Sequence, residues 1–135
     1  MNQIERNLIF DLGVNHGDDT EFYLAKGFRV VGVEADPIIA QELGRRFAAE
    51  IADGRFVLEA VGILDKPGQQ TFYRNIFCDH WSSFDPGYGC RGDTQFETIL
   101  VECKPISYLF EKYGYPYYLK VDIEGADQLL DFGPA

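Results

Sequence analysis

Short apolar runs alternate with helix-like segments along most of this chain, and that alternation restricts the possible folds more than any other feature. The runs at 7–13, 28–36, 55–62 and 117–123 read as buried strands. Helical patterns separate the first three runs. Between the third and the last run lie a region of another character, at 66–103, and a further helical pattern. Because a strand, a helix and a parallel strand connect through a right-handed crossover, this order predicts an α/β domain with a mostly parallel sheet.

The helical segments have recognisable starts and ends. Residues 18–27 begin with acids, which a helix N-terminus favours, and finish at Gly27, a usual C-terminal cap. Asp36 and Pro37 form an N-cap and first helical residue. The helix that they open repeats an apolar residue every four positions, at Ile39, Leu43, Phe47 and Ile51. A further helix is predicted over 105–114.

The region from 66 to 103 has another character. Two short β-like runs, 70–75 and 96–103, flank a loop over 78–93. This loop is rich in glycine but also contains Trp81 and Phe84, which is too aromatic for a plain linker. We expect it to cover a pocket.

The composition fits one globular domain over residues 1–135, of which 46% are hydrophobic. Lys and Arg number 12 against 22 Asp and Glu, and the formal charge of -10 disfavours binding to nucleic acid or anionic lipid. No apolar run approaches the roughly 20 residues of a membrane span, and no signal peptide is recognisable. We expect a soluble protein.

The cysteines Cys78, Cys90 and Cys103 form an odd set without a CxxC pair, which favours the reducing cytoplasm over a disulfide framework. An alternative is a zinc ion shared by Cys78, His80 and Cys90. Their spacing matches no standard zinc finger, and a fourth ligand is missing. We therefore expect a cytoplasmic protein without a metal centre at these thiols.

Two strand ends indicate a ligand. After the first strand, Gly13 and Gly17 let the backbone turn sharply and approach a ligand with no Cβ in the way. At the end of the adjacent strand, Glu34 can accept hydrogen bonds from both hydroxyls of a ribose. Because ligands bind at the carboxyl ends of parallel strands, the pair predicts a nucleoside site.

Charge narrows the choice of nucleoside. A dinucleotide site places pyrophosphate at the first helix N-terminus, usually through GxGxxG. Here an acid, Asp11, precedes the first glycine, and Asp18 and Asp19 stand where the helix starts. Carboxylates repel pyrophosphate but tolerate S-adenosylmethionine, which has a positive sulfonium and amino group. The alternative for Asp18 is a helix cap alone.

Several segments in one order also match a known family. They are IFDLGVNHGDDT, VVGVEADP, EAVGILDKPG, the Ser82–Ser83 pair and YYLKVDIEGAD. With them the chain resembles the FkbM-type S-adenosylmethionine-dependent methyltransferases over nearly its whole length. The resemblance implies a Rossmann-like class I methyltransferase fold and methyl transfer, usually to a hydroxyl oxygen of a small metabolite or sugar. His16 and Asp127 depart from the residues more usual there.

The resemblance also implies roles for site residues. Eight positions are carried over as cofactor contacts: Asp11, Gly13 and Gly17 for the methionine pocket, Glu34 for the ribose, Glu59 and Ala60 near the adenine, and Ser82 and Ser83 from the aromatic loop. Purely structural alternatives stay open for two of these sets. Glu59, at the end of the third strand, is alternatively a solvated acid without a ligand. Ser82 and Ser83 alternatively stabilise a turn.

Methyl transfer to a hydroxyl needs alignment of the reactants and a base for the proton. Asp122, at the end of the last strand, is the first candidate for that base, or for a metal ligand that acidifies the hydroxyl. Strand alternation lets Lys120 reach Asp122 or Glu124, and a purely structural ion pair is the alternative. His80 is a second candidate base, with a solvated loop histidine as its alternative.

The length of the chain leaves a different class of function open. A class I methyltransferase sheet normally continues with three more strands that help to build the acceptor pocket, so we expect a domain incomplete at its C-terminus. The chain is then alternatively a cofactor-binding fragment or interaction module without catalysis. A nicotinamide-dependent oxidoreductase is opposed by the missing GxGxxG. The edge of the run at 117–123 lacks a neighbour, which predicts association with another copy, a rearranged segment or a longer parent chain.

Overall fold

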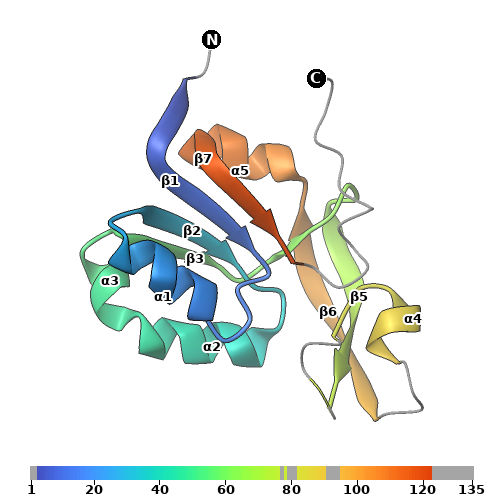
Figure 1. Cartoon of the computed structure of the whole chain (residues 1–135). Coiled ribbons are helices and arrows are strands. Elements are labelled where there is room, and N and C mark those ends of the chain that lie inside the picture. Colours follow the sequence, from blue (N-terminus) through green and yellow to red (C-terminus); the bar gives the residue numbers. More distant parts are fainter. Residues whose placement is uncertain (1–2, 77, 79–81, 91–94, 123–135) are drawn as a thin grey trace.

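The computed structural model describes residues 3–76, 78, 82–90 and 95–122. Its main sheet contains four parallel strands in the order β3-β2-β1-β7. These are β1 (Ile4–Leu12), β2 (Arg29–Val33), β3 (Phe56–Glu59) and β7 (Tyr115–Val121). The predicted α/β class with a mostly parallel sheet is therefore confirmed (Figure 1).

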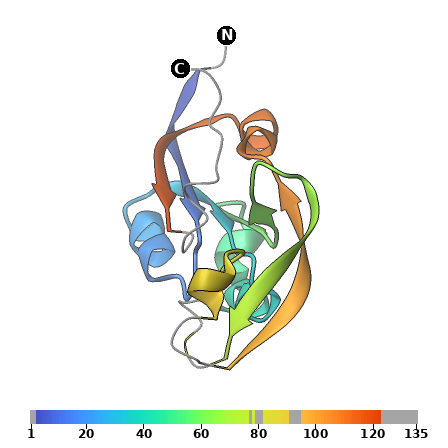
Figure 2. The ribbon, with the colours of Figure 1, turned by 90° about the vertical axis from the view of Figure 1, so that its right-hand side faces the viewer.

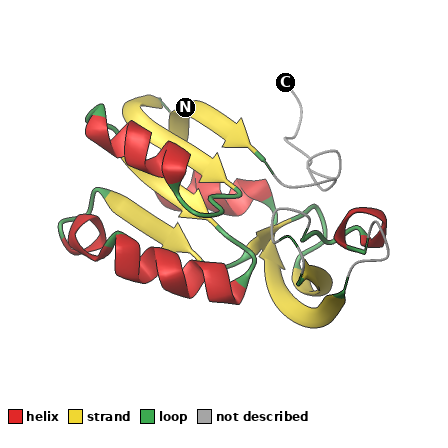
Figure 3. Cartoon of the chain, turned by 60° about the horizontal axis from the view of Figure 1, so that its bottom comes forward, coloured by secondary structure: helices red, strands yellow, loops and turns green. Residues whose placement is uncertain are grey.

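Helices cover both faces of this sheet (Figure 3). On one face lie α1 (Asp18–Ala25), α2 (Pro37–Arg46) and α3 (Ala48–Ala52), and α5 (Ile106–Tyr113) lies on the other. Each face has its own apolar cluster, because successive side chains of a strand point to opposite sides. In β1, Ile9 packs with Leu24 and Leu43, whereas Phe10 packs with Ile106 and Leu109.

A second, smaller sheet is inserted between β3 and α5. It contains β4 (Gly62–Ile63), β5 (Gly68–Asn75) and β6 (Phe96–Lys104) in the order β4-β6-β5, with β5 and β6 antiparallel. Figure 2 shows this long, curved pair at the side of the domain with α4 (Pro86–Gly89) beside it. The two β-like runs predicted from sequence thus pair with each other.

One predicted helix cap is confirmed and another is wrong. Asp36 caps α2 as expected, since its carboxylate accepts hydrogen bonds from the N–H groups of Ile38 and Ile39. The cap reading of Asp18 is wrong, because Gly17 occupies the N-cap of α1 and no side chain among the described residues caps that helix. Asp18 instead lies 3.5 Å from the guanidinium of Arg46.

Two predicted elements are divided. The apolar repeat expected to continue to Ile51 is interrupted at Phe47, where α2 ends and α3 begins, and Ile51 is 38% exposed. The run at 55–62 leaves the main sheet after Glu59, and Gly62 already pairs with β6 of the smaller sheet. The hydrophobic periodicity of the sequence did not reveal either break, because both halves of each predicted element are similarly apolar.

Candidate functional site

The carboxyl ends of β1 and β2 lie side by side, and the loop after β1 closes over them. The N–H groups of Gly13 and Val14 both donate to the carbonyl oxygen of Val33, at 2.9 and 3.1 Å. Gly13 has φ 88° and Gly17 has φ 94°, a left-handed backbone that suits glycine. A Cβ at Gly17 would lie 2.7 Å from the ring of Phe47. The loop therefore needs glycine for both its turn and its packing.

Glu34 lies directly below this loop, and its carboxylate is held by two backbone donors. The Asn15 N–H donates to Oε1 at 2.7 Å and the Asp36 N–H donates to Oε2 at 3.0 Å. Although Glu34 follows the end of a strand, it is buried and only 8% exposed. Burial, together with the nearby charges of Asp36 and Asp11, raises the pKa of Glu34 to about 7, although the two N–H groups oppose this rise.

Asp11 forms the second buried acid of the site. Its Oδ2 accepts a hydrogen bond of 2.7 Å from the hydroxyl of Thr20, and its Oδ1 lies 3.4 Å from the Lys120 ammonium. That contact does not have hydrogen-bond geometry, so Oδ1 has no hydrogen-bond donor among the described residues. Burial raises the pKa of Asp11 above its ordinary value, and Lys120 opposes the rise.

Lys120 joins three elements at this edge. Its ammonium lies 2.7 Å from Asp19 of α1, 3.4 Å from Asp11 of β1 and 3.8 Å from Asp122. The sequence predicted Asp122 or Glu124 as its partner; Asp122 is the most distant of the three acids, and Glu124 lies outside the described residues. The parallel register places Lys120 opposite Asp11, which explains why its ammonium lies closer to Asp11 than to Asp122.

Asp122 follows β7 at the same edge of the sheet. Its N–H donates to the carbonyl oxygen of Leu12 at 2.8 Å, so the last strand ends beside the first. The Asp122 side chain is 60% exposed and open to solvent. The other candidate base, His80, lies outside the described residues.

Glu59, at the end of β3, is held by α5. Its carboxylate accepts hydrogen bonds from the hydroxyls of Tyr108 and Tyr113 and from the Lys112 ammonium at 2.9 Å. Burial alone would raise the pKa of Glu59, but the hydrogen bonds from Tyr113 and Lys112 outweigh it and lower that pKa. The alternative of a merely solvated acid is therefore wrong. Its neighbour Ala60 is exposed, and a contact of either residue with adenine stays a prediction.

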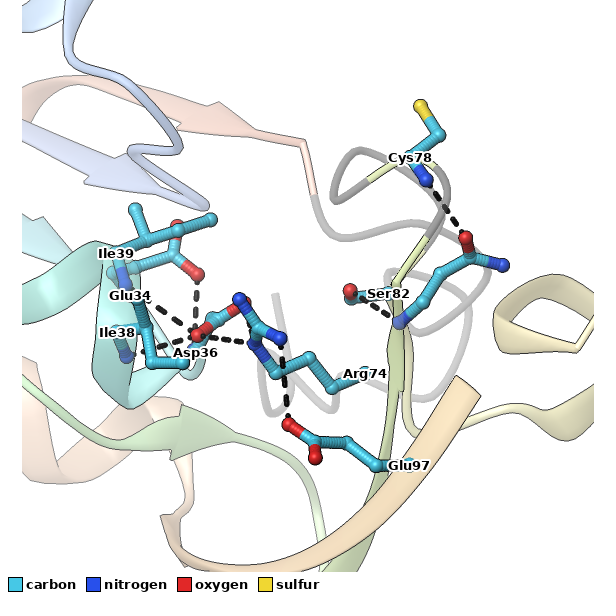
Figure 4. Close-up of polar contacts among 9 residues, drawn as sticks. Glu34, Asp36, Ile38, Ile39, Arg74, Cys78, Ser82 and Glu97 are labelled. Atoms are coloured by element: carbon cyan, nitrogen blue, oxygen red, sulfur yellow. Dashed lines mark hydrogen bonds and ion pairs between the residues drawn. The ribbon is translucent and has the colours of Figure 1, made fainter. Parts of the chain in front are cut away.

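The serine pair fastens the loop to β5. Ser82 accepts a hydrogen bond of 2.9 Å at its Oγ from the Asn75 N–H (Figure 4). Ser83 is buried and exchanges two backbone hydrogen bonds with Tyr73, and its Oγ accepts from the N–H of Asp85. These contacts support the structural reading of the pair, and contact with a cofactor stays a prediction.

Cysteine chemistry adds no metal centre to the described part of the chain. Cys78, Cys90 and Cys103 are all free thiols. Within residues 3–76, 78, 82–90 and 95–122, no cluster of His, Cys, Asp and Glu has the arrangement of a metal site. The described helices also include none that is long and apolar enough to span a membrane.

Comparison with known proteins decides the family. Residues 11–128 match the Methyltransferase FkbM domain, which is most of the chain. The chain belongs to the FkbM methyltransferase family. The family resemblance and the Rossmann-like fold expected from it are thereby confirmed.

A solved structure supports the fold of this FkbM domain. The crystal structure of Methyltransferase FkbM from Methylobacillus flagellatus KT superposes with a TM-score of 0.58 over 96% of the chain, at 19% sequence identity. The chain covers 29% of that protein. At this identity the likeness concerns the fold alone.

A curated relative is similar over a shorter stretch. The probable ribosomal RNA small subunit methyltransferase A of Methanospirillum hungatei JF-1 is 42% identical to the present chain over 55 residues, which are 41% of the present chain. The chain spans 22% of the length of that relative. Both comparisons therefore relate this chain to part of a longer protein.

The described residues fit the cofactor that the family implies. The buried Oδ1 atoms of Asp11 and Asn15 lack hydrogen-bond donors within the described chain, so a ligand amino group has acceptors at this edge. Each carboxylate oxygen of Glu34 accepts one N–H and has a further lone pair for a hydroxyl.

Three site residues were not recognised from the sequence. Asn15 turns its N–H to Glu34 because its φ is 56°, Thr20 donates to Asp11, and Arg74 pairs with Asp36. An asparagine between two glycines of a turn was the one local signal, since asparagine tolerates this backbone region. The other two depend on contacts distant in sequence, which no local pattern indicates.

Proposed function

We propose that this FkbM domain binds S-adenosylmethionine at the carboxyl edge of the main sheet and transfers its methyl group to a hydroxyl oxygen of a small metabolite or sugar. The observation that carries the proposal is the buried Glu34 carboxylate directly below a glycine loop. A buried carboxylate is unfavourable unless it is compensated, and two ribose hydroxyls supply the donors that an ionised carboxylate favours.

The residues around Glu34 suit a ligand without phosphate. Asp18 and Asp19 stand at the start of α1, where a pyrophosphate-binding helix would present uncompensated N–H groups. Asp11, Gly13 and Gly17 would hold the methionine part of the cofactor. When bound, the cofactor supplies an electrophilic methyl group on a positive sulfur.

Further cofactor contacts are proposed at the rim of this edge. Glu59 and Ala60 follow β3, the neighbour of β2, which supports a place near the adenine. Ser82 and Ser83 anchor the loop to β5, and we propose that the loop held in this way contacts the cofactor. The Ser82 Oγ accepts one backbone N–H and retains a hydroxyl proton for a ligand.

Asp122 is the proposed general base. It is exposed, follows β7 and is joined to the end of β1 through the Leu12 carbonyl, so an acceptor at this edge could reach it. An ionised carboxylate within hydrogen-bond reach can take the proton of an attacking hydroxyl. His80 is the second proposed base.

The acceptor class is supported by charge. The sequence has a net charge of -10, which disfavours a polyanionic acceptor such as RNA. The relative from Methanospirillum hungatei, named as a ribosomal RNA methyltransferase, raises RNA as a second candidate acceptor. Methyl transfer to short RNA and to small hydroxylated compounds, measured side by side, would separate the two.

The three free thiols support a reducing, cytoplasmic location.

Binding without catalysis is the alternative function. The chain corresponds to 22% and 29% of the two proteins it matches, so the activity of those whole proteins does not transfer to this chain. We expect this 135-residue chain to bind cofactor but to transfer little methyl by itself. Robust turnover on a hydroxylated acceptor would contradict that expectation.

Thermal unfolding tests the proposal directly. S-adenosylmethionine and S-adenosylhomocysteine should raise the midpoint, because a ligand that binds only the folded state stabilises it by mass action. NAD should not. The Glu34→Ala variant should bind the cofactor roughly tenfold or more weakly by calorimetry, since hydrogen bonds to a charged acceptor are lost. Selective stabilisation by NAD would overturn the assignment.

A further inference from the structure

Arg74 of β5 links the smaller sheet to the end of β2 (Figure 4). Its Nε lies 3.0 and 3.2 Å from the two carboxylate oxygens of Asp36, and its Nη1 lies 3.3 Å from Oε1 of Glu97 on β6. The Asp36 side chain is 1% exposed and that of Arg74 is 18% exposed. A carboxylate so buried needs a cation and hydrogen-bond donors beside it, and Arg74 supplies both.

Asp36 connects this ion pair to the proposed ribose site. Its carboxylate also accepts from the N–H groups of Ile38 and Ile39 and so fixes the start of α2. Its own N–H donates to Oε2 of Glu34 at 3.0 Å. The Glu34 carboxylate is therefore held by a residue whose side chain is held, in turn, by Arg74.

The next residue of β5, Asn75, ties the same strand to the loop. Its N–H donates to Ser82 Oγ, its Nδ2 donates to the carbonyl oxygen of Gly89 at 2.8 Å, and its Oδ1 accepts from the Cys78 N–H at 2.8 Å. Adjacent residues of one strand thus contact the end of β2 on one side and the loop on the other. A shift of β5 would affect both.

We propose that Arg74 is a positioning residue, which fixes the Glu34 carboxylate for the ribose and couples its orientation to the loop at residues 82–90. The inference rests on the proposed function, because Glu34 is a cofactor residue only there. Arg74 does not need to touch the cofactor. It acts through Asp36, whose position sets one of the two N–H groups on Glu34.

Charge provides a readout that a purely structural ion pair would not move. Besides burial, the charges of Asp36 and Asp11 raise the pKa of Glu34. Arg74 offsets the first of these charges, and Lys120 lies beside the second. Since the ionised Glu34 is the better acceptor for two hydroxyls, cofactor affinity should rise with pH. The midpoint of that rise should depend on Arg74.

The experiment is calorimetric titration of the full chain with S-adenosylhomocysteine between about pH 5.5 and 8.5, a window around the pKa of Glu34. Arg74→Gln should weaken binding roughly fivefold to tenfold at neutral pH and move the midpoint upward. Arg74→Lys, which keeps the charge, should restore most of the affinity. Asp36→Asn removes a negative charge and should move the midpoint downward.

A matched control is Arg55→Gln, because Arg55 forms an exposed pair of 3.0 Å with Asp53 far from the site. It should bind as the wild type does. Wild-type affinity and midpoint in Arg74→Gln would overturn the inference, even if that variant unfolds at lower temperature.

If circular dichroism shows that Arg74→Gln does not fold, the Asp36→Asn variant decides instead. An unchanged midpoint of the pH dependence of affinity in Asp36→Asn would then overturn the inference. A wild-type chain that binds no cofactor would instead refute the proposed function itself. Cofactor binding by the wild type, combined with unaltered variants, would refute only the role of Arg74. The two failures are therefore distinguishable.

Discussion

Replacement of Glu34 by glutamine should change how the stability of this domain depends on pH. Glu34 has a pKa of about 7 in the folded chain against an ordinary value of 4.5. The folded state therefore binds more protons than the unfolded state between these values, so stability is full below 4.5 and decreases as pH rises through about 7. The buried charge costs roughly 3 kcal/mol above that window.

Glutamine is neutral at every pH and removes this cost. Its amide oxygen replaces only one of the two acceptors that hold the N–H groups of Asn15 and Asp36, and the lost hydrogen bond costs about 1 kcal/mol. Glu34→Gln should therefore be less stable than the wild type by about 1 kcal/mol near pH 4.5. It should be more stable by roughly 2 kcal/mol near pH 8.

Urea unfolding at several pH values measures the difference in free energy between variant and wild type, in which the titration of other groups cancels. Glu111→Gln is the control, because that carboxylate is exposed on α5 and has no comparable burial cost. A difference that stays constant from about pH 4.5 to 8 would refute the reasoning. The expected result would also indicate that this acid is retained for a ligand at the expense of stability.

Three other predictions concern the ion cluster, the glycine loop and the sheet edge. Lys120→Met should lower the free energy of unfolding by roughly 2 kcal/mol at neutral pH; the loss should shrink in acid, where Asp11 is protonated, and an equal loss at both pH values would contradict it. Gly17→Ala should cost about 2 to 4 kcal/mol through its left-handed backbone and the clash with Phe47, whereas Gly54→Ala, also at positive φ but in open space, should cost about 1 to 2 kcal/mol; equal losses in urea unfolding would remove the clash argument. In the described chain β7 pairs only with β1, so light scattering across a dilution series should reveal association; a strict monomer with fast amide exchange along β7 would rule out pairing between copies.

Several local features of the fold followed from the sequence. The order of strands and helices, the Asp36 cap of α2 and the glycines of the turn after β1 all depend on residues within one or two turns of each other. Propensity, capping and backbone sterics act over that range. The family resemblance added the Rossmann-like fold, which the comparisons confirm.

Only the tertiary structure decided the partners and burial of the charged groups. Lys120 pairs with Asp11 and Asp19 because parallel register and the start of α1 bring three distant segments together. Glu34 is buried because the loop after β1 folds over it, and Arg74 reaches Asp36 from another sheet. A charge takes its pKa from its surroundings in space, and the order of residues along the chain does not determine those surroundings.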